Sequence, residues 1–344
     1  MADGRIAHLE RLAEQQRYLE VIDLAQALLA ERSRGLWAYG HFFLGQAMNR
    51  LFRPEEAINH LRQARDLFEA LDEPWLAAEC LEWEAGARYL QEDPDALGMA
   101  EEALRRYRQL EPRAAEVESR MLEHLGTILV RHRSFLRARE CYDEALQVAG
   151  ARLDIVRLAR IYHGLGTCHG SLGDPQRAID LTSRAVTLYS VENDIRPQPA
   201  RVDLPRAEGD LGMCYLRQGD LDRAEELFQA ALDHLAETGV ERLRSHGLLS
   251  LAELRQAQGR LDEALALIDE AIALAGRFGE QMALAAACQQ LGHVHAERGQ
   301  AALSDQCFER ALAILEQAGL DERRTLCLAA FHRVREGRPH ASEA

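Results

Sequence analysis

Histidine and cysteine side chains that stand close together are the first candidates for chemistry in this chain, because imidazole and thiolate groups are common metal ligands. His293 and His295 lie two residues apart, and Cys288 stands five residues before the first of them. On a helix, residues at i and i+2 point to different faces, whereas neighbours on one face are three or four residues apart. We therefore expect no metal site here.

The adjacent residues Cys168 and His169 are a second candidate. The same arrangement recurs 46 residues later as Cys214 and Tyr215, so the histidine occupies a slot that an aromatic ring fills elsewhere. This favours core packing over ligation. The chain has no lysine and hence no G-x-x-x-x-G-K phosphate loop, and it shows no paired nucleophile and base. We expect no catalytic residue, no metal and no cofactor.

Arginine supplies all 41 residues of the Lys+Arg total. An arginine-only basic set is typical of genomes rich in G and C, which suggests a bacterial source. Each arginine carries a permanent charge and a planar fork of N–H donors that can hold a carboxylate through two hydrogen bonds. The formal net charge is −15, so we do not expect the protein as a whole to bind nucleic acid, which requires a basic surface.

Composition indicates that helices position these side chains. Hydrophobic residues make up 47% of the chain and aromatic residues only 6%, with alanine and leucine dominant, which favours closely packed helices. No stretch approaches 18 apolar residues, and residues 1–10 lack the apolar core of a signal peptide. We therefore expect a cytoplasmic protein that does not enter a membrane.

The cysteines agree with a reducing compartment. Their number is odd and none forms a C-x-x-C pair, so we expect them to act as small buried hydrophobic residues. They are Cys80, Cys141, Cys168, Cys214, Cys288, Cys307 and Cys327.

A repeated spacing organises most of the chain. Each unit has a Leu and a small anchor residue, then an Ala 12 residues after the anchor and a second Ala seven residues later. In one unit Gly212 precedes Ala224 and Ala231, with Phe228 between them. The six anchors are Gly45, Gly126, Gly166, Gly212, Ala252 and Gly292, and Ser304 replaces the first Ala in the last unit.

This spacing predicts pairs of helices. The anchor lies on a first helix, where a small residue lets the next helix approach, and we expect the Ala 12 residues later to face it from a second helix. Gln218-Gly219-Asp220 and Gln258-Gly259-Arg260 are typical of the turns between them. Glycine in such a turn can adopt the left-handed conformation that ends a helix.

The pattern resembles the tetratricopeptide-repeat (TPR) consensus, a helix-turn-helix unit, up to about Gly319. Six units match well, a weaker one contains Trp83 and Gly86, and a degenerate first unit covers residues 6–31. The period of about 40 exceeds the usual value of about 34 and is similar to that of long repeats in signalling scaffolds and bacterial regulators. The resemblance implies an all-α, right-handed α-solenoid (superhelix) of antiparallel helix pairs.

The expected layout is a single solenoid over residues 1–337 with a tail, 338–344, expected to be disordered. A capping helix, 320–337, would close it, with Arg323, Arg324 and Arg333 on a polar outer face. The units are expected at about 1–34, 35–73, 74–113, 114–152, 153–199, 200–240, 241–280 and 281–319.

One interval between anchors is 46 residues instead of 40, and the extra residues fall in 190–206, which contains Pro197, Pro199 and Pro205. We expect an irregular loop here. It is either a tolerated insertion between repeats or a hinge or lip over the groove.

The resemblance also implies where a partner binds. In TPR proteins the first helices line a concave groove, with groove positions at −6, −3, +1, +4 and +5 from the anchor. At −6 and +5, six of the twelve residues are arginine, whereas the overall arginine content would give one or two. The predicted groove residues are Tyr39, Phe42, Gln46, Asn49, Arg50, Arg120, Glu123, Thr127, Arg131, Arg160, His163, Thr167, Arg206, Met213 and Arg217.

Such an arginine-rich groove suggests a partner with acidic or carboxylate groups. The alternative is that these arginines only solvate exposed helix faces and pair with local glutamates, and the sequence leaves both interpretations open.

We therefore expect a non-catalytic scaffold or adaptor that binds a protein or peptide, with no direct contact to nucleic acid or membrane. The alternative is a regulatory sensor whose superhelix changes when a peptide or small ligand binds, and which controls a partner such as a transcription factor or kinase. Partner, pathway and oligomeric state, a homo-oligomer included, stay open.

Overall fold

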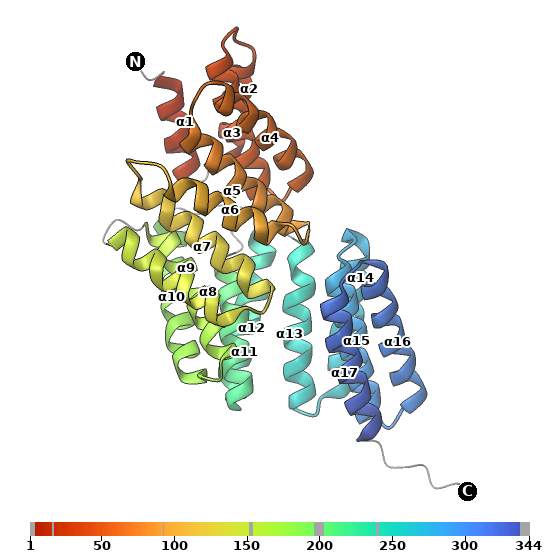
Figure 1. Cartoon of the computed structure of the whole chain (residues 1–344). Coiled ribbons are helices and arrows are strands. Elements are labelled where there is room, and N and C mark those ends of the chain that lie inside the picture. The colour runs from red at the N-terminus through yellow and green to blue at the C-terminus, as the bar shows by residue number, and fades with distance from the viewer. Residues whose placement is uncertain are drawn as a thin grey trace, which may run out of the picture. The chain divides into compact units, whose positions relative to one another are not determined.

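A computed structural model of the chain describes residues 4–15, 17–91, 93–150, 154–195, 203–238 and 241–337. Over these residues the chain is helical and contains no strand (Figure 1). Its contacts divide it into two compact units, with residues 1–198 in unit 1 and residues 199–344 in unit 2. The boundary falls within the segment 190–206 that carries the extra residues.

Unit 1 consists of consecutive helices joined by short connections. They are α1 (Gly4–Glu14), α2 (Tyr18–Leu29), α3 (Arg34–Arg50), α4 (Pro54–Ala70), α5 (Pro74–Leu90), α6 (Ala96–Arg108), α7 (Ala115–Arg131), α8 (Phe135–Ala149), α9 (Ile155–Ser171) and α10 (Pro175–Ile195).

Unit 2 continues the same pattern. Its helices are α11 (Asp203–Gln218), α12 (Leu221–Thr238), the short 3₁₀ helix η2 (Glu241–Leu243), α13 (Arg244–Ala257), α14 (Leu261–Phe278), α15 (Gln281–Glu297), α16 (Ala301–Gln317) and α17 (Asp321–Glu336).

Local sequence signals start several helices. Pro54, Pro74 and Pro175 occupy first-turn positions, where the missing N–H of proline costs no helical hydrogen bond. Asp154 accepts a hydrogen bond of 2.8 Å from the N–H of Arg157 and thereby caps the start of α9.

The helices of each unit form two layers. Each odd-numbered helix packs on the even-numbered helix that follows it. Odd-numbered helices also contact one another, as in α3 with α5, α5 with α7 and α7 with α9 in unit 1, and α11 with α13 and α13 with α15 in unit 2. Even-numbered helices make no comparable contacts among the described residues. The odd-numbered helices therefore share one continuous layer within each unit.

The anchors lie where the two helices of a pair approach closely, as predicted. The residue that covers each anchor, however, is not the one that was expected. A Cβ atom added at Gly45 would lie 2.5 Å from Leu61, and one added at Gly212 would lie 2.6 Å from Phe228. The residue that covers the anchor is thus 16 positions later in the chain, because its longer side chain reaches back across the helix pair. The Ala 12 positions later, such as Ala57, is fully buried but presents only its main-chain oxygen to the anchor.

The turns within the pairs confirm the predicted role of glycine. Gly219, Gly259 and Gly299, each seven residues after its anchor, have φ angles of 88°, 73° and 71°. Phe52 and Arg133 hold the same position in unit 1 with φ angles of 57° and 54°. The left-handed turn is therefore set by the repeat geometry and is kept even where no glycine is present.

The segment 190–206 is more helical than predicted. Residues 190–195 continue α10 and residues 203–206 belong to α11, while residues 196–202, and with them Pro197 and Pro199, lie outside the described residues. At the other end, the predicted capping helix is present as α17, with Arg323, Arg324 and Arg333 exposed. The predicted tail, 338–344, lies outside the described residues.

All seven cysteines are free, as expected. Four of them, Cys80, Cys168, Cys288 and Cys327, are buried, and the other three are partly buried. Burial raises the pKa of the Cys168 thiol to about 12 and that of Cys327 to about 11, so both stay uncharged in the core.

Candidate functional site

The predicted groove residues of unit 1 lie on three odd-numbered helices, α3, α7 and α9. Helix α5 contacts both α3 and α7 but carries no residue of the predicted set. Its side chains therefore complete the surface that the prediction described only in part.

Trp83 of α5 is the aromatic centre of this layer and is 6% exposed. The guanidinium groups of Arg50 and Arg120 lie 5.0 and 5.4 Å from the centre of its ring. His124 meets the ring edge-on, with ring centres 5.4 Å apart, and Asn49 donates a hydrogen bond of 3.2 Å to the main-chain oxygen of Trp83. Two predicted groove arginines thus form cation–π contacts with one ring.

Arg120 also pairs with two carboxylates of α5. Its Nη2 atom lies 2.7 Å from Glu79 Oε2 and 3.4 Å from Glu82 Oε2. Glu82 is 2% exposed, and its Oε1 atom meets Nδ1 of His124. Burial acts to raise the pKa of Glu82, but His124 and Arg120 outweigh it and hold this pKa below its usual value. The Nη2 group of Arg120 is therefore engaged within the protein.

Four buried polar atoms in this region have no hydrogen-bond partner: Glu82 Oε2, Trp83 Nε1, Arg120 Nε and Glu123 Oε2. Glu123 Oε2 lies 3.9 Å from His124 Nε2, which is too long for a hydrogen bond. An unpaired buried polar group costs about 1–3 kcal/mol, so four together need an explanation. These atoms belong to a set of six contacting residues that we call the α5–α7 cluster: Glu79, Glu82, Trp83, Arg120, Glu123 and His124.

Further along the layer, Arg131 stacks on Tyr89 of α5. Its guanidinium lies 4.6 Å from the ring centre, and Nη1 donates a hydrogen bond of 3.3 Å to the main-chain oxygen of Tyr89. Thr127 donates to the main-chain oxygen of Glu123 and shares a hydrogen bond of 3.1 Å with the hydroxyl of Tyr142. These contacts fix the side chains of α7 against α5 and α8.

On α9, Arg160, His163 and Thr167 are partly buried. The hydroxyl of Thr167 donates a hydrogen bond of 3.1 Å to the main-chain oxygen of His163. The three residues follow one another at about one helical turn, so they lie on the same face of α9.

On α3 the predicted residues divide between core and surface. Phe42 is 4% exposed and packs on Phe68 in the core, with ring centres 6.0 Å apart. Tyr39 packs edge-on against the same ring but stays partly exposed, as does Gln46. Burial raises the pKa of the Tyr39 hydroxyl, and Glu73 adds to this effect.

The remaining three predicted residues lie on α11 of unit 2. Arg206 and Arg217 are exposed, and Met213 is partly buried against the core around Phe228. Burial raises the pKa of Glu253 on α13, and Arg217 acts in the opposite direction. These three residues belong to the odd-helix layer of unit 2, whereas the other predicted residues belong to unit 1.

His293 and His295, the two candidate metal ligands, contact other side chains. His293 meets Phe308 edge-on, with ring centres 5.1 Å apart, whereas His295 donates to Gln300 at 2.6 Å. In the part of the chain that the structure describes, no group of three or more His, Cys, Asp or Glu side chains is arranged to hold a metal ion. No described helix combines the length and apolar character needed to cross a membrane.

Sequence reasoning missed Trp83, Glu79, Glu82 and His124. Trp83 stands at −3 from Gly86, so the groove rule applied to the weaker unit would have found it. The other three stand one residue away from groove positions, and no sequence signal distinguishes them. They join the site because α5 and α7 pack side by side.

Comparison with known proteins identifies the repeat. The family model described as "Tetratricopeptide repeat" matches residues 117–190, 203–275 and 244–317, which together cover more than half of the chain. The chain belongs to the tetratricopeptide-repeat family. This confirms the resemblance drawn from the anchors, and the TPR match extends over both units. No curated protein matches the sequence.

Solved structures share this TPR fold at low sequence identity. A Rap protein complexed with competence and sporulation factor is 19% identical, with a TM-score of 0.66 over 87% of this chain and 80% of that chain. The apo quorum sensor NprR from B. thuringiensis is 14% identical, with a TM-score of 0.69 over 90% and 86%. The Rap conjugation gene regulator of plasmid pLS20, in complex with the Phr* peptide, is 14% identical, with a TM-score of 0.65 over 93% and 96%.

Proposed function

We propose that this TPR protein is a non-catalytic binding protein that holds a peptide segment on the odd-helix layer of unit 1. The α5–α7 cluster carries this proposal, because it combines two N–H donors and two carboxylate oxygens that have no hydrogen-bond partner. A peptide unit supplies the complementary groups, a carbonyl acceptor and an N–H donor. Two structures with the same fold are complexes, one with competence and sporulation factor and one with the Phr* peptide.

Binding at this cluster requires a local rearrangement. The unpaired atoms are buried, and Arg50 and Arg120 lie against the ring of Trp83. A ligand reaches them when these guanidinium groups move off the ring. The contacts to be exchanged are cation–π contacts, which are modest in energy, and the largely buried ion pairs of Arg120 with Glu79 and Glu82, which cost more to break.

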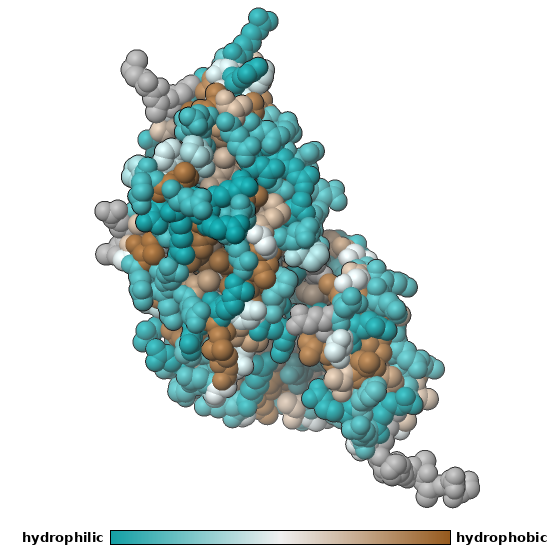
Figure 2. Space-filling view, viewed as in Figure 1, coloured by the Kyte–Doolittle hydropathy of each residue, from teal (hydrophilic) through white to brown (hydrophobic). Residues whose placement is uncertain are grey.

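Acidic groups of the peptide are assigned to Arg131 and Arg160, two partly buried arginines of the predicted groove set on α7 and α9. A guanidinium that stacks on a ring through its face, as Arg131 does on Tyr89, still directs N–H donors outward in its own plane. A carboxylate can be held by such in-plane donors. The face of the molecule seen in Figure 2 is mostly hydrophilic, with hydrophobic residues in separate groups.

The proposal can be tested by selecting peptides from a random library on the full-length protein and measuring their affinity by fluorescence anisotropy. Arg131→Glu and Arg160→Glu should each weaken the selected peptides at least about tenfold, which corresponds to about 1.4 kcal/mol. The control is Arg137→Glu on α8, an exposed arginine outside the odd-helix layer. Failure to enrich any peptide, or equal affinity for all three variants, would show that this layer is not the binding site.

A regulatory sensor is the second candidate, and it is favoured by the division of the chain into two compact units. A ligand that binds one arrangement of the units better than another shifts the population between them. Small-angle scattering with and without a selected peptide separates the candidates. A sensor changes its radius of gyration on binding, whereas a scaffold keeps the same value.

A further inference from the structure

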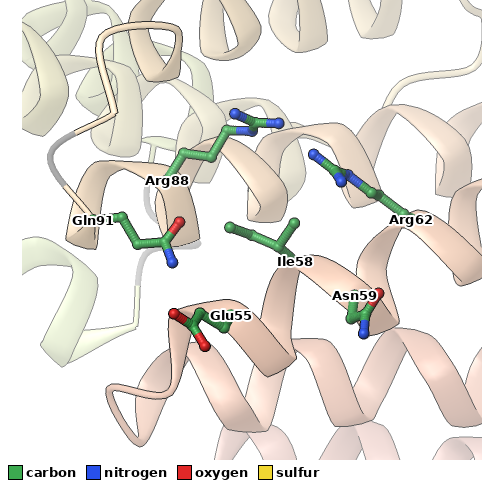
Figure 3. Close-up of a pocket in the computed structure, with 6 residues that line it drawn as sticks. All are labelled: Glu55, Ile58, Asn59, Arg62, Arg88 and Gln91. Atoms are coloured by element: carbon green, nitrogen blue, oxygen red, sulfur yellow. The ribbon is translucent and has the colours of Figure 1, made fainter.

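A pocket of about 280 Å³ lies between α4 and α5 of unit 1, and none of its lining residues belongs to the predicted groove set. Figure 3 shows the guanidinium groups of Arg62 and Arg88 turned towards each other, with Glu55 and Gln91 facing each other nearby. The pocket is lined by Glu55, Ile58, Asn59, Arg62, Arg88 and Gln91.

A buried carboxylate holds the two arginines in place. Glu84 is 2% exposed, and its Oε1 atom accepts hydrogen bonds from Nε of Arg62 at 2.9 Å and from Nε of Arg88 at 3.3 Å. Its Oε2 atom accepts a third bond from Nη1 of Arg65 at 2.9 Å. Because two guanidinium groups converge on one oxygen, they stay side by side despite their like charges.

Positive charge at this point exceeds what Glu84 neutralises. Three guanidinium groups surround one buried carboxylate, and Arg88 also pairs with a second carboxylate, Asp93. The N–H of Asp95 lowers the pKa of Asp93, and Arg88 lowers it further, so Asp93 keeps its charge. Arg62 gives only Nε to Glu84, so its terminal Nη groups are not used in that bond.

We propose that this pocket binds an oxyanion, either a carboxylate or a phosphate group, between Arg62 and Arg88. The side-chain amides of Asn59 and Gln91 add neutral N–H donors to the same pocket. Guanidinium groups already held by Glu84 lose little further side-chain entropy on binding, and their in-plane donors suit both kinds of oxyanion. The site is independent of the proposed peptide binding.

Glu55 sets the affinity of this site for an anion, because it is the one carboxylate among the six lining residues. Its negative charge opposes an incoming anion. Neither Glu55 nor Asn59 bonds to Glu84, so both can be changed without breaking the arginine cluster. The pair Glu55→Gln and Asn59→Asp therefore alters the charge of the pocket in opposite directions and leaves its framework intact.

The experiment is calorimetric titration of the full-length protein with inorganic phosphate and, separately, with glutarate, at constant ionic strength. Saturable binding of at least one anion is expected. Glu55→Gln should tighten it about threefold or more, and Asn59→Asp should weaken it about fivefold or more, as a neighbouring like charge does. Gln26→Glu adds the same charge to α2, outside the pocket, and should leave the affinity within about twofold.

Tighter binding of phosphate assigns the pocket to a phosphate group, and tighter binding of glutarate assigns it to a carboxylate. Absence of saturable binding for both anions overturns the proposal. So does an equal effect of Asn59→Asp and Gln26→Glu, because a general change in net charge would then account for it. Selected peptides should bind the Asn59→Asp variant as they bind the unmodified protein, so failure of this site is distinguishable from failure of peptide binding.

Discussion

At the scale of single residues, Arg120 joins two helices through charge. Its guanidinium lies between the ring of Trp83 and the carboxylates of Glu79 and Glu82, and Glu82 is almost fully buried. A carboxylate removed from water is stable as a charge only when cations or donors surround it. Arg120 therefore has a structural role whether or not a ligand binds nearby.

Replacing Arg120 with Met should destabilise unit 1 by about 3 kcal/mol, because the buried carboxylate of Glu82 then loses its guanidinium partner. Urea unfolding followed by tryptophan fluorescence measures this change, since all three tryptophans, Trp37, Trp75 and Trp83, lie in unit 1.

Arg137→Met provides the matched control, because Arg137 and its partner Glu101 are both exposed. Such a surface pair is worth about 0–1 kcal/mol. Adding Glu82→Gln to Arg120→Met should restore part of the stability, because it removes the buried negative charge that Arg120 would otherwise pair with. Equal midpoints for Arg120→Met and Arg137→Met would contradict the role given to Arg120.

At the scale of elements, Tyr142 links three helices. It belongs to α8 and fits between two glycines, Gly126 on α7 and Gly164 on α9. A Cβ atom at Gly126 would lie 2.8 Å from its ring, and one at Gly164 would lie 2.6 Å from its hydroxyl oxygen. Only the absence of side chains at both positions lets the ring enter, so these glycines serve close packing.

Gly164→Ala should therefore destabilise unit 1 by about 1–3 kcal/mol, the usual cost of overpacking a core. Gly98 on α6 is the control, because a Cβ atom there would have nothing within 4 Å. Gly98→Ala should instead stabilise the helix by about 0.5–1 kcal/mol through its better helix propensity. Thermal unfolding of both variants tests the pair, and a Gly164→Ala protein as stable as Gly98→Ala would refute the packing role.

At the scale of the whole molecule, the chain consists of successive helix pairs and divides into two compact units. In a repeat protein each pair is stabilised mainly by its neighbours, so cooperativity can break where contacts are sparse. We predict that unit 1 and unit 2 unfold at different urea concentrations. Tryptophan fluorescence reports on unit 1 alone, whereas far-ultraviolet circular dichroism reports on helices of both units. Superimposable transitions from the two signals would show instead that the chain unfolds as one cooperative body.

Much of the fold could be predicted because the anchors recur at a regular interval. Each anchor marks a close helix contact, and Gly219 or Gly259 marks the turn that follows it. The site was less predictable. Phe42 stands at a groove position yet packs in the core, since Phe68 lies behind it. Arg120 stands at another groove position, yet its Nη2 group pairs with Glu79 and Glu82.

The sequence by itself determined the repeat, the all-helical TPR fold and the identity of the first helices, because these follow from local spacing. Only the tertiary structure decided which charges are already paired and which remain available. The partners of Arg120 on α5 are 41 and 38 residues away in the chain, and Glu84 gathers Arg62 and Arg65 from the preceding helix. Such pairings depend on how neighbouring helices pack, and no periodicity within one repeat specifies them.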